Sequence, residues 1–482
     1  MGVRNVDDYK KTIASYDTEV YFQGERINDV ANHPCVKPIV ESIGATFDID
    51  RLAIPKELAY VAAPIEGTIN RHNHLIETAD DAVKRVKLVR ELSFKTGACT
   101  HRCVGIDAVN TLDVMTRKID RECNTEYHSR FSAFMHKVKM EDWVLAASMT
   151  DGKGDRSKKP KEQSDSDLFL RIIAKSEKGI VVRGAKVHQG RPMAVDWMLV
   201  LPGTGLGPDE ADHAVVFAVR PDTPGLSMVM SQGPAELFRM QADQEDLGNP
   251  QYGLHIGNLL IFNEVFIPWE HVFLCGEYQY VGELVDIFCR YHRMATGGCK
   301  AGLCDLIATL GAMIAEMNGL AKASHIKDKL IDIIKLGETS YGCAIAAATL
   351  GEKTSDGNFI PNAMQANITK LNAADAVNRS LALLQDIAGA LVATLPSQKD
   401  LDSPTNGAFI RKYLASDGIG CEEKFKIFRL AQNLIFGAQG LVALHGGGSP
   451  QVQRMAVLFE ANLQKKRTRA RALAGINDTK GV

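Results

Sequence analysis

Four side chains in two short segments are of the types that bind iron in proteins. Cys99 and Cys103 are four positions apart in the first segment (ACTHRCVG), and His292 and Cys299 are seven apart in the second (YHRMATGGCKAGLC). Iron–sulfur clusters are usually held by four cysteines, and a histidine in place of one cysteine changes the charge and potential of the cluster. Three thiols and one imidazole therefore indicate an iron–sulfur site. From spacing alone, buried structural cysteines and a core histidine remain a competing interpretation.

The spacing also predicts how each pair is held. If the chain from Cys99 to Cys103 is helical, both thiols lie on one face, about 6 Å apart along the axis at ~1.5 Å per residue. Seven residues of unbroken helix would separate His292 from Cys299 by about 10 Å, too far to share one cluster comfortably. Because glycine can break or kink a helix, we expect the Gly-Gly pair before Cys299 to turn its thiolate back toward the histidine.

The composition excludes several classes of protein. The 482 residues include 56 Lys and Arg against 58 Asp and Glu, a net charge of -2 that argues against a nucleic-acid binder. The sequence contains no run of 18 apolar residues, so it predicts no membrane span. Residues 1–11 are polar and do not resemble a signal peptide. We therefore expect a cytoplasmic protein that binds neither nucleic acid nor membranes, with its ten cysteines reduced.

The predicted secondary structure changes twice along the chain, from helix to strand and back to helix. Residues 78–93 carry an apolar stripe at helical spacing. Runs rich in β-forming residues, bounded by Gly, Pro and Asp, occur at 179–183, 197–201 and 214–220. Long alanine-rich helical segments follow. The sequence thus predicts an α+β protein with three domains: N-terminal helical (1–142), middle β (143–276) and C-terminal helical (277–482).

The chain resembles the 4-hydroxybutyryl-CoA dehydratases, within the wider family of 4-hydroxyphenylacetate 3-hydroxylase flavoproteins. The resemblance runs nearly end to end and is carried by the following segments: YFQGER (21–26), TDGKGDRS (150–157), VVRGAK (181–186) with His188 and Gln189, FIPW (266–269), DIAG (386–389), LPS (395–397) and HGGGSP (445–450). The hydroxylases share most of these segments, whereas the set of Cys99, Cys103, His292 and Cys299 separates the dehydratases. At the matching positions the dehydratases hold a [4Fe–4S] cluster.

The resemblance implies an acyl-CoA dehydrogenase-like fold, a homotetramer, and a small-molecule substrate, an acyl-CoA, between FAD and the cluster. It implies flavin contacts from the following residues: Met149, Thr150, Arg156, Ser157, His188, Gln189, Asp386, Gly389, Leu395 and Ser397. The last four belong to the C-terminal helices, either of the same chain or of a neighbouring subunit. A loop rich in Gly, Lys, Arg and Ser offers donors to a pyrophosphate, although it is no Rossmann fingerprint.

The resemblance further implies a radical dehydratase with isomerase activity. Removing water from a 4-hydroxyacyl thioester requires loss of a hydrogen from carbon 3, which the thioester does not acidify. In the dehydratases flavin transiently removes one electron and cluster iron binds the leaving hydroxyl. His292 would be ligand and base, because its two ring nitrogens allow both roles. Lys300, Arg90 and His101 are further catalytic candidates. Their competing interpretations are a solvated lysine, a surface ion pair and a packing histidine.

Several positions depart from the dehydratase pattern. Thr296 replaces a tyrosine, His101 a glutamine, Gly190 a threonine and Gly257 a glutamate, and no acid follows the Gly-Ser-Pro element, where Gln453 lies nearby. Two of these replacements are glycines, which enlarge a site and remove hydrogen bonds. We therefore expect a specificity altered from 4-hydroxybutyryl-CoA.

Two other functions remain open from the sequence. One is a flavin monooxygenase or oxidase of the hydroxylase type, in which the cluster is structural and a reductase partner is needed. The other is a non-catalytic flavin and cluster protein that senses or carries electrons. Iron, sulfide and flavin content separates a cluster enzyme from a plain hydroxylase. Anaerobic turnover without an electron acceptor separates the dehydratase from both.

Overall fold

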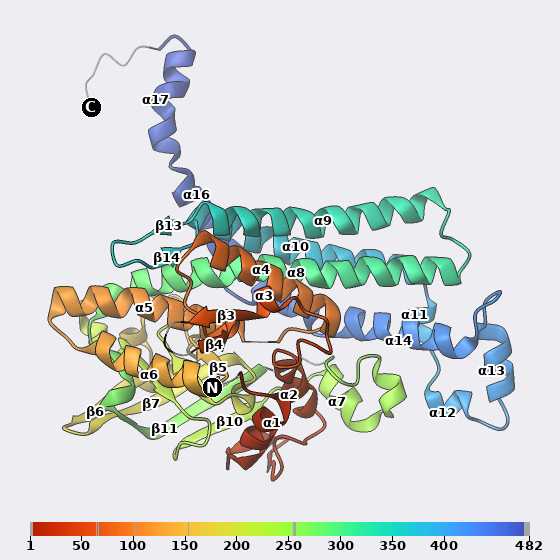
Figure 1. Ribbon diagram of the computed structural model, residues 1–482, viewed down its shortest axis with the longest axis horizontal. Helices are drawn as coiled ribbons and strands as arrows, with labels where there is room; N and C mark the ends of the chain where they lie inside the picture. Colours follow the sequence, from red (N-terminus) through yellow and green to blue (C-terminus); the bar gives the residue numbers. More distant parts are fainter. Residues whose placement is uncertain are drawn as a thin grey trace.

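The computed structural model describes residues 3–63, 65, 67–100, 102–152, 154–253 and 257–476. Long helices lie along one side of the molecule and two β-sheets with shorter helices along the other (Figure 1). The helices are α1 (Val6–Ser15), α2 (Lys37–Gly44), α3 (Lys56–Ala59), α4 (Ala79–Thr96), α5 (Cys103–Cys123), α6 (Tyr127–Glu141), α7 (Pro234–Gln241), α8 (Val281–Met317), α9 (Ser324–Thr349), α10 (Ala363–Ala388), α11 (Leu391–Thr394), α12 (Gln398–Leu401), α13 (Gly407–Leu414), α14 (Cys421–Phe436), α15 (Gln439–His445), α16 (Pro450–Ala461) and α17 (Leu463–Leu473).

The strands form two sheets and two small hairpins within the described part of the chain. A six-stranded sheet has the order β2-β1-β10-β11-β7-β6, and a four-stranded sheet has the order β12-β9-β8-β5. The strands are β1 (Val20–Phe22), β2 (Glu25–Arg26), β3 (Tyr60–Ala63), β4 (Gly67–Asn70), β5 (Leu145–Ser148), β6 (Arg171–Ser176), β7 (Gly179–Gly190), β8 (Trp197–Val200), β9 (Val215–Val219), β10 (Leu226–Met230), β11 (Gly257–Pro268), β12 (Val272–Cys275), β13 (Glu352–Lys353) and β14 (Phe359–Ile360). The mixed helix and sheet composition expected from the sequence is confirmed.

The N-terminal segment adds two strands that the sequence analysis did not anticipate. β1 pairs in parallel with β10, and β2 folds back onto β1. The two-residue turn between them has positive φ at Gln23 (54°) and Gly24 (85°), the conformation of a type I′ hairpin. The segment YFQGER, singled out above only for its resemblance, is therefore a hairpin at the edge of the larger sheet.

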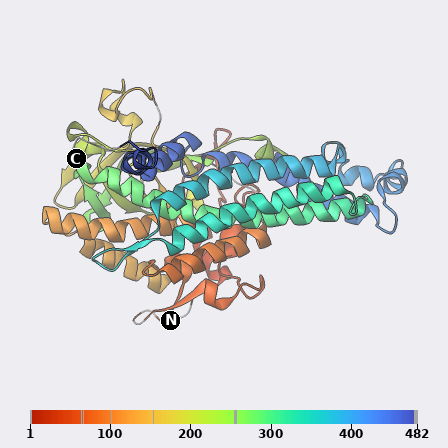
Figure 2. The same ribbon diagram turned by 90° about the horizontal axis from the view of Figure 1, so that it is seen from above.

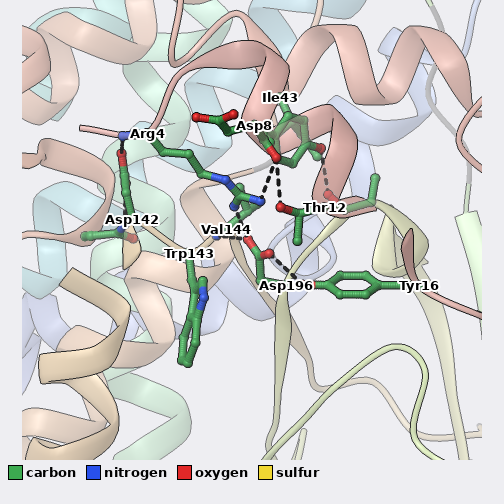
Figure 3. A network of polar contacts seen from close by, with 12 residues as sticks. Arg4, Asp8, Thr12, Tyr16, Ile43, Asp142, Trp143, Val144 and Asp196 are labelled. Atoms are coloured by element: carbon green, nitrogen blue, oxygen red, sulfur yellow. Dashed lines mark hydrogen bonds and ion pairs between the residues drawn. The ribbon is translucent and has the colours of Figure 1, made fainter. Parts of the chain in front are cut away.

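A buried carboxylate anchors the N-terminal segment to the middle of the protein (Figure 3). Asp196 is fully buried; it accepts hydrogen bonds from Arg4 (2.8 Å), the Tyr16 hydroxyl (2.9 Å) and the backbone N–H of Val144 (2.7 Å). Charge-assisted bonds of this kind are the stronger ones in proteins, and their loss would leave a buried charge unpaired. The contact holds the start of the chain against β5, whose end leads to the predicted flavin loop.

The long helices pack lengthwise on one another. α8 packs against α4, α9 and α10, and an apolar core between α8, α10 and α14 continues away from the sheets. By length and composition, two segments, 278–317 and 421–461, are apolar enough to cross a membrane. The first contains α8 and is mostly buried in the protein. The second is divided into α14, α15 and α16 by Gly437 and the glycines 446–448.

Candidate functional site

Cys99 and Cys103 do not lie on one helix, contrary to the expectation from their spacing. α4 ends at Thr96 with Gly97 as a left-handed cap (φ 60°), and α5 begins only at Cys103. Gly97 permits this sharp ending because it has no Cβ. Cys99 therefore lies in the connection between two helices, whereas Cys103 opens the second and is buried. His101 lies outside the described residues.

His292 and Cys299 lie two turns apart on α8, which runs unbroken through Gly297 and Gly298. The predicted break at these glycines is therefore wrong. A Cβ on Gly298 would collide with the backbone carbonyl of Val86 on α4, and a Cβ on Gly297 would lie 2.6 Å from Ala344 on α9. The glycines allow three helices to approach closely, and this packing brings α8 against the middle of α4.

The three cysteines influence one another electrostatically. Burial raises the pKa of Cys103 well above its ordinary value, and the neighbouring Cys99 and Cys299 add to this rise. Burial also raises the pKa of Cys299 to about 11, opposed by Lys300 and supported by Cys99. No three His, Cys, Asp or Glu side chains of the described chain converge at the distances of a single metal ion.

Asp107 connects the histidine to the cysteines, and the sequence analysis missed it. His292 Nδ1 lies 2.8 Å from Asp107 Oδ2, while Asp107 Oδ1 accepts a hydrogen bond from Arg85 at 2.5 Å. The same Arg85 nitrogen donates to the Cys103 carbonyl at 3.1 Å. A carboxylate on Nδ1 fixes the imidazole tautomer and leaves Nε2 for a ligand or proton, as at metal sites. The available signal was the position of Asp107, one helical turn after Cys103.

Three buried cations lie near His292 and Cys299. Lys300 is buried on α8, as is Arg293, and Lys370 is fully buried on α10. Sequence reasoning proposed Lys300 and missed the other two. Thr296, one turn after His292, donates its hydroxyl to the His292 carbonyl at 2.8 Å. Its hydroxyl is thereby occupied by its own helix.

Arg90, proposed above as a catalytic residue, forms ion pairs between helices. Its guanidinium binds Asp305 at 2.8 Å and Glu338, and it stacks on the Tyr341 ring at 4.3 Å. These partners lie on α8 and α9, and the side chain is partly exposed. The structure therefore shows Arg90 in the interhelical ion pair that was its competing interpretation.

The predicted flavin residues of the middle β-domain lie close together. Met149 and Thr150 follow β5, and the Val187 N–H donates to the Thr150 carbonyl at 2.8 Å. Buried Lys186 ties the two segments, donating to the Met149 carbonyl at 3.1 Å and to Asp151 at 2.7 Å. His188 has a positive φ of 61° where the β7–β11 pairing is irregular. Such a bulge re-aims a side chain, and His188 is exposed.

The departures Gly190 and Gly257 are opposite one another in the β7–β11 ladder. Among the described residues, a Cβ built on Gly257 would meet only the Ser231 hydroxyl, at 4.0 Å. Gln189 lies next to them; its backbone carbonyl accepts a hydrogen bond from Asn258 at 3.0 Å.

The other predicted flavin residues are spread over the molecule. Arg156 and Ser157 are exposed in the loop after β5, where Ser157 binds Asp155. The four C-terminal candidates, Asp386, Gly389, Leu395 and Ser397, lie in the last turn of α10 and in the segment after it, at the opposite end of the long axis from that loop in both views (Figures 1 and 2). Within one chain, the structure does not bring these two groups together.

Comparison with known proteins gives consistent results for both halves of the chain. Residues 5–274 match the family model described as 4-hydroxyphenylacetate 3-hydroxylase N terminal, and residues 281–475 match the corresponding C terminal model. The chain is 36% identical to 4-hydroxybutyryl-CoA dehydratase/vinylacetyl-CoA-Delta-isomerase of Clostridium aminobutyricum, over 98% of this chain and 99% of the relative. It is 24% identical to a 4-hydroxyphenylacetate 3-monooxygenase oxygenase component of Thermus thermophilus, over 90% and 88%.

Solved structures give the same relationship. An oxygen-tolerant archaeal 4-hydroxybutyryl-CoA dehydratase from N. maritimus superposes with a TM-score of 0.96 at 38% identity, covering 100% of this chain and 97% of that one. The 4-hydroxyphenylacetate 3-monooxygenase oxygenase component complexed with FAD shares the fold, with a TM-score of 0.85 at 20% identity and 98% of both chains covered. The expected acyl-CoA dehydrogenase-like fold is matched only distantly, by glutaryl-CoA dehydrogenase at a TM-score of 0.52 and 12% identity over 94% and 89%. Since family models cover both halves and a relative matches from end to end, the chain belongs to the 4-hydroxyphenylacetate 3-hydroxylase family, within which it is related to 4-hydroxybutyryl-CoA dehydratase.

Proposed function

We propose that this protein is a dehydratase, a lyase that removes water from a hydroxyacyl-CoA or a related hydroxy acid, with double-bond isomerisation as a second activity. The observation that carries the proposal is the pairing of His292 with Asp107 beside three neighbouring cysteines. The end-to-end relative named for dehydratase and isomerase activity supports the same reaction class.

The proposal includes a [4Fe–4S] cluster held by Cys99, Cys103, Cys299 and His292. The donor set fits such a group better than a single ion, because each ligand of a cubane binds a different iron and the donors need not converge on one point. Asp107 behind the imidazole is the partner that a ligating histidine usually has.

The proposal also includes FAD beside Met149, Thr150, His188 and Gln189, supported by the relative of the same fold that is complexed with FAD. The C-terminal candidates, Asp386 to Ser397, would reach this flavin only from a neighbouring subunit, which is why a homotetramer is part of the proposal. Sedimentation of the cytoplasmic enzyme should then give about four times the mass of one chain.

In the reaction, cluster and flavin would supply a Lewis-acidic iron for the leaving hydroxyl and a reversible one-electron exchange. The residues of the chain do the rest. Asp107 holds the proton of His292 on Nδ1 and so leaves Nε2 as the atom that would bind the cluster iron; when Nε2 is not bound to iron, the same nitrogen can accept or return a proton. Buried Lys300 provides a positive charge for a substrate oxygen, and the enclosing helices exclude water.

The proposal is tested on protein purified without oxygen. We expect about four irons per chain and a flavin spectrum, and Cys299→Ala should lose the iron. Cys304→Ala is the matched control, because Cys304 is a buried cysteine of the same helix that faces Ser380 and Gly337 instead. Iron-free wild-type protein would refute the cluster.

Activity is tested separately. Hydroxyacyl-CoA compounds and hydroxy acids are supplied anaerobically with no electron acceptor, and unsaturated products are followed by mass spectrometry. A dehydratase turns over under these conditions, whereas a monooxygenase requires oxygen and reduced flavin. Turnover only with oxygen and a reductant would replace the proposal with the hydroxylase type.

A further inference from the structure

Positive charge is concentrated beside His292 and Cys299. Arg293 and Lys300 are the next residues on α8, and Lys370 extends toward them from α10. Their exposed fractions are 4%, 6% and 0%. None of the three forms an ion pair with a carboxylate of the described chain. Buried cations are costly unless an opposite charge accompanies them, so this cluster requires an anion.

The cations are held by neutral groups and retain free hydrogen-bonding capacity. Lys370 Nζ donates to the Ala443 carbonyl at 2.7 Å, and Arg293 binds the Gly447 carbonyl (Nε, 3.2 Å) and the side chain of Asn367. The Lys300 ammonium forms no hydrogen bond with the described residues, yet it is not among their fully enclosed polar atoms. It therefore remains available to a ligand.

Two of the charges lie at the same glycine loop: a Cβ on Gly448 would lie 3.3 Å from Arg293 Nη2, and one on the adjacent Gly447 would lie 3.5 Å from Lys370 Cε. Burial and the charges of Lys300 and Arg293 together lower the pKa of Lys370 to about 8, and Cys299 opposes them. The nearby carboxylate, Asp107, is already bonded to Arg85 and His292. Thiolates that ligate a cluster share their charge with its iron, so they do not fully neutralise three additional cations.

The loop that covers this region carries no side chains. Gly447 and Gly448 have φ values of 79° and 98°, and a Cβ on Gly447 would lie 2.9 Å from the His292 ring and 3.5 Å from Lys370 Cε. Behind the loop, fully buried Gln453 donates to the Gly448 carbonyl at 2.8 Å, while its Oε1 has no partner among the described atoms. A carboxylate at Gln453 would have supplied the missing counter-charge, but the amide does not.

We propose that Arg293, Lys300 and Lys370 form a carboxylate-binding subsite beside His292, and that the substrate carries a free carboxylate there. This inference rests on the proposed function, because it assigns the substrate class of the same site. A guanidinium matches a carboxylate geometrically, and the two ammonium groups add charge without demanding one orientation. Because the subsite lies next to His292, we assign it to the reacting part of the substrate. The phosphates of CoA are not the expected anion, since the pantetheine arm separates them from the thioester.

The test compares two acyl-CoA compounds that differ only in this group: glutaryl-CoA, whose acyl chain ends in a free carboxylate, and the corresponding terminal amide. Titration calorimetry on the anaerobic holoenzyme should show the acid binding tighter than the amide by about 10- to 100-fold. The reason is that a hydrogen bond to a charged group contributes more binding free energy than one to a neutral group. Lys370→Met and Lys300→Met should each remove most of this preference, and Lys300→Arg should retain it. Lys300→Met remains informative if Lys370→Met fails to fold, because the Lys300 ammonium has no hydrogen bond to lose.

Lys118→Met is the control, because Lys118 pairs with Glu283 on the surface and should leave the preference unchanged. Equal affinity for acid and amide would overturn the subsite, as would a preference that survives both Lys300→Met and Lys370→Met. If the three cations instead bind the phosphates of CoA, the acid and the amide should also bind with equal affinity. The dehydratase proposal fails on a different readout, the absence of anaerobic turnover in a holoenzyme that still prefers the acid.

Discussion

At the scale of single residues, the site depends on the partner of each reactive group more than on the group itself. Asp107 binds Nδ1 of His292 and so determines that Nε2 is the ring nitrogen left for a ligand or proton. The Thr296 hydroxyl donates a hydrogen bond to the His292 carbonyl and is therefore not available to a substrate. Sequence motifs reveal the reactive groups because their types are unusual. Their partners are ordinary residues on other helices, and only the packed fold identifies them.

Asp107→Asn should lower turnover by about 10- to 100-fold, the usual effect of removing a partner of a ligating histidine. The amide keeps the shape but no longer stabilises a proton on Nδ1, so the pH dependence of kcat should shift as well. Iron and flavin content should stay near wild type. Asp305→Asn, which affects the interhelical pair with Arg90, is the control. Unchanged turnover and pH profile in Asp107→Asn would show that the imidazole does not need this carboxylate.

Gly257 offers a test of altered specificity. We predict that 4-hydroxybutyryl-CoA is a poor substrate, because each missing hydrogen-bonding group costs about 1–3 kcal/mol when its partner stays unpaired. Among the described residues, a Cβ on Gly257 meets only Ser231, at 4.0 Å, so we expect Gly257→Glu to accommodate its side chain. The variant should raise kcat/KM for 4-hydroxybutyryl-CoA by about tenfold or more. Efficient turnover of that compound by the wild-type enzyme would contradict the prediction.

At the scale of elements, the sequence predicted what depends on local pattern. The apolar stripe at 78–93 lies in α4, and the β-rich runs at 179–183, 197–201 and 214–220 lie in β7, β8 and β9. The errors occurred where packing overrides local preference. Gly297 and Gly298 remain helical because neighbouring helices press on both sides, and Cys99 leaves the helix because Gly97 ends it.

Gly298→Ala should therefore disturb the site through packing. Its Cβ would collide with the Val86 carbonyl, which is backbone and cannot move aside alone, so overpacking should cost about 1–3 kcal/mol. The thermal midpoint and the iron content should both fall. Gly342→Ala on α9 is the matched control: its Cβ meets nothing within 4 Å, and alanine stabilises a helix interior by about 0.5–1 kcal/mol. Full iron occupancy at an unchanged midpoint in Gly298→Ala would contradict this account.

At the scale of the whole molecule, the sheets and the distal helices lie at opposite ends (Figure 1). β5, whose end leads to the predicted flavin loop, lies among the sheets, while α11 to α13 form the opposite end (Figure 1). α17 extends away from the body, and it carries a run of basic residues, none of which is buried. Resemblance, and not periodicity, was the only sequence signal that joined the two ends into one site.

The long core helix also gives the protein a measurable alkaline sensitivity. Burial raises the pKa of Cys304 on α8 from 9.0 to about 11. Between these values the unfolded chain releases the thiol proton and the folded chain keeps it, so the free energy of unfolding falls as pH rises, by up to about 2–3 kcal/mol for this group. Relative to Cys304→Ala, wild type should thus lose part of its thermal-midpoint advantage between pH 8.5 and about 10.5. A constant difference across that range would rule out the buried thiol as a source.

The unbroken course of α8 has a practical consequence for changing the substrate. One rigid rod fixes the axial distance between the imidazole and the thiol, so loop motion cannot adapt that distance to longer or shorter molecules. Accommodation must come from segments that approach the rod from the side: the open start of β11 at Gly257 and the glycine loop at 446–448. Libraries aimed at new hydroxy acids should keep α8 constant and randomise these two approaches, where a new side chain alters the room for the substrate without altering the spacing of the reactive groups.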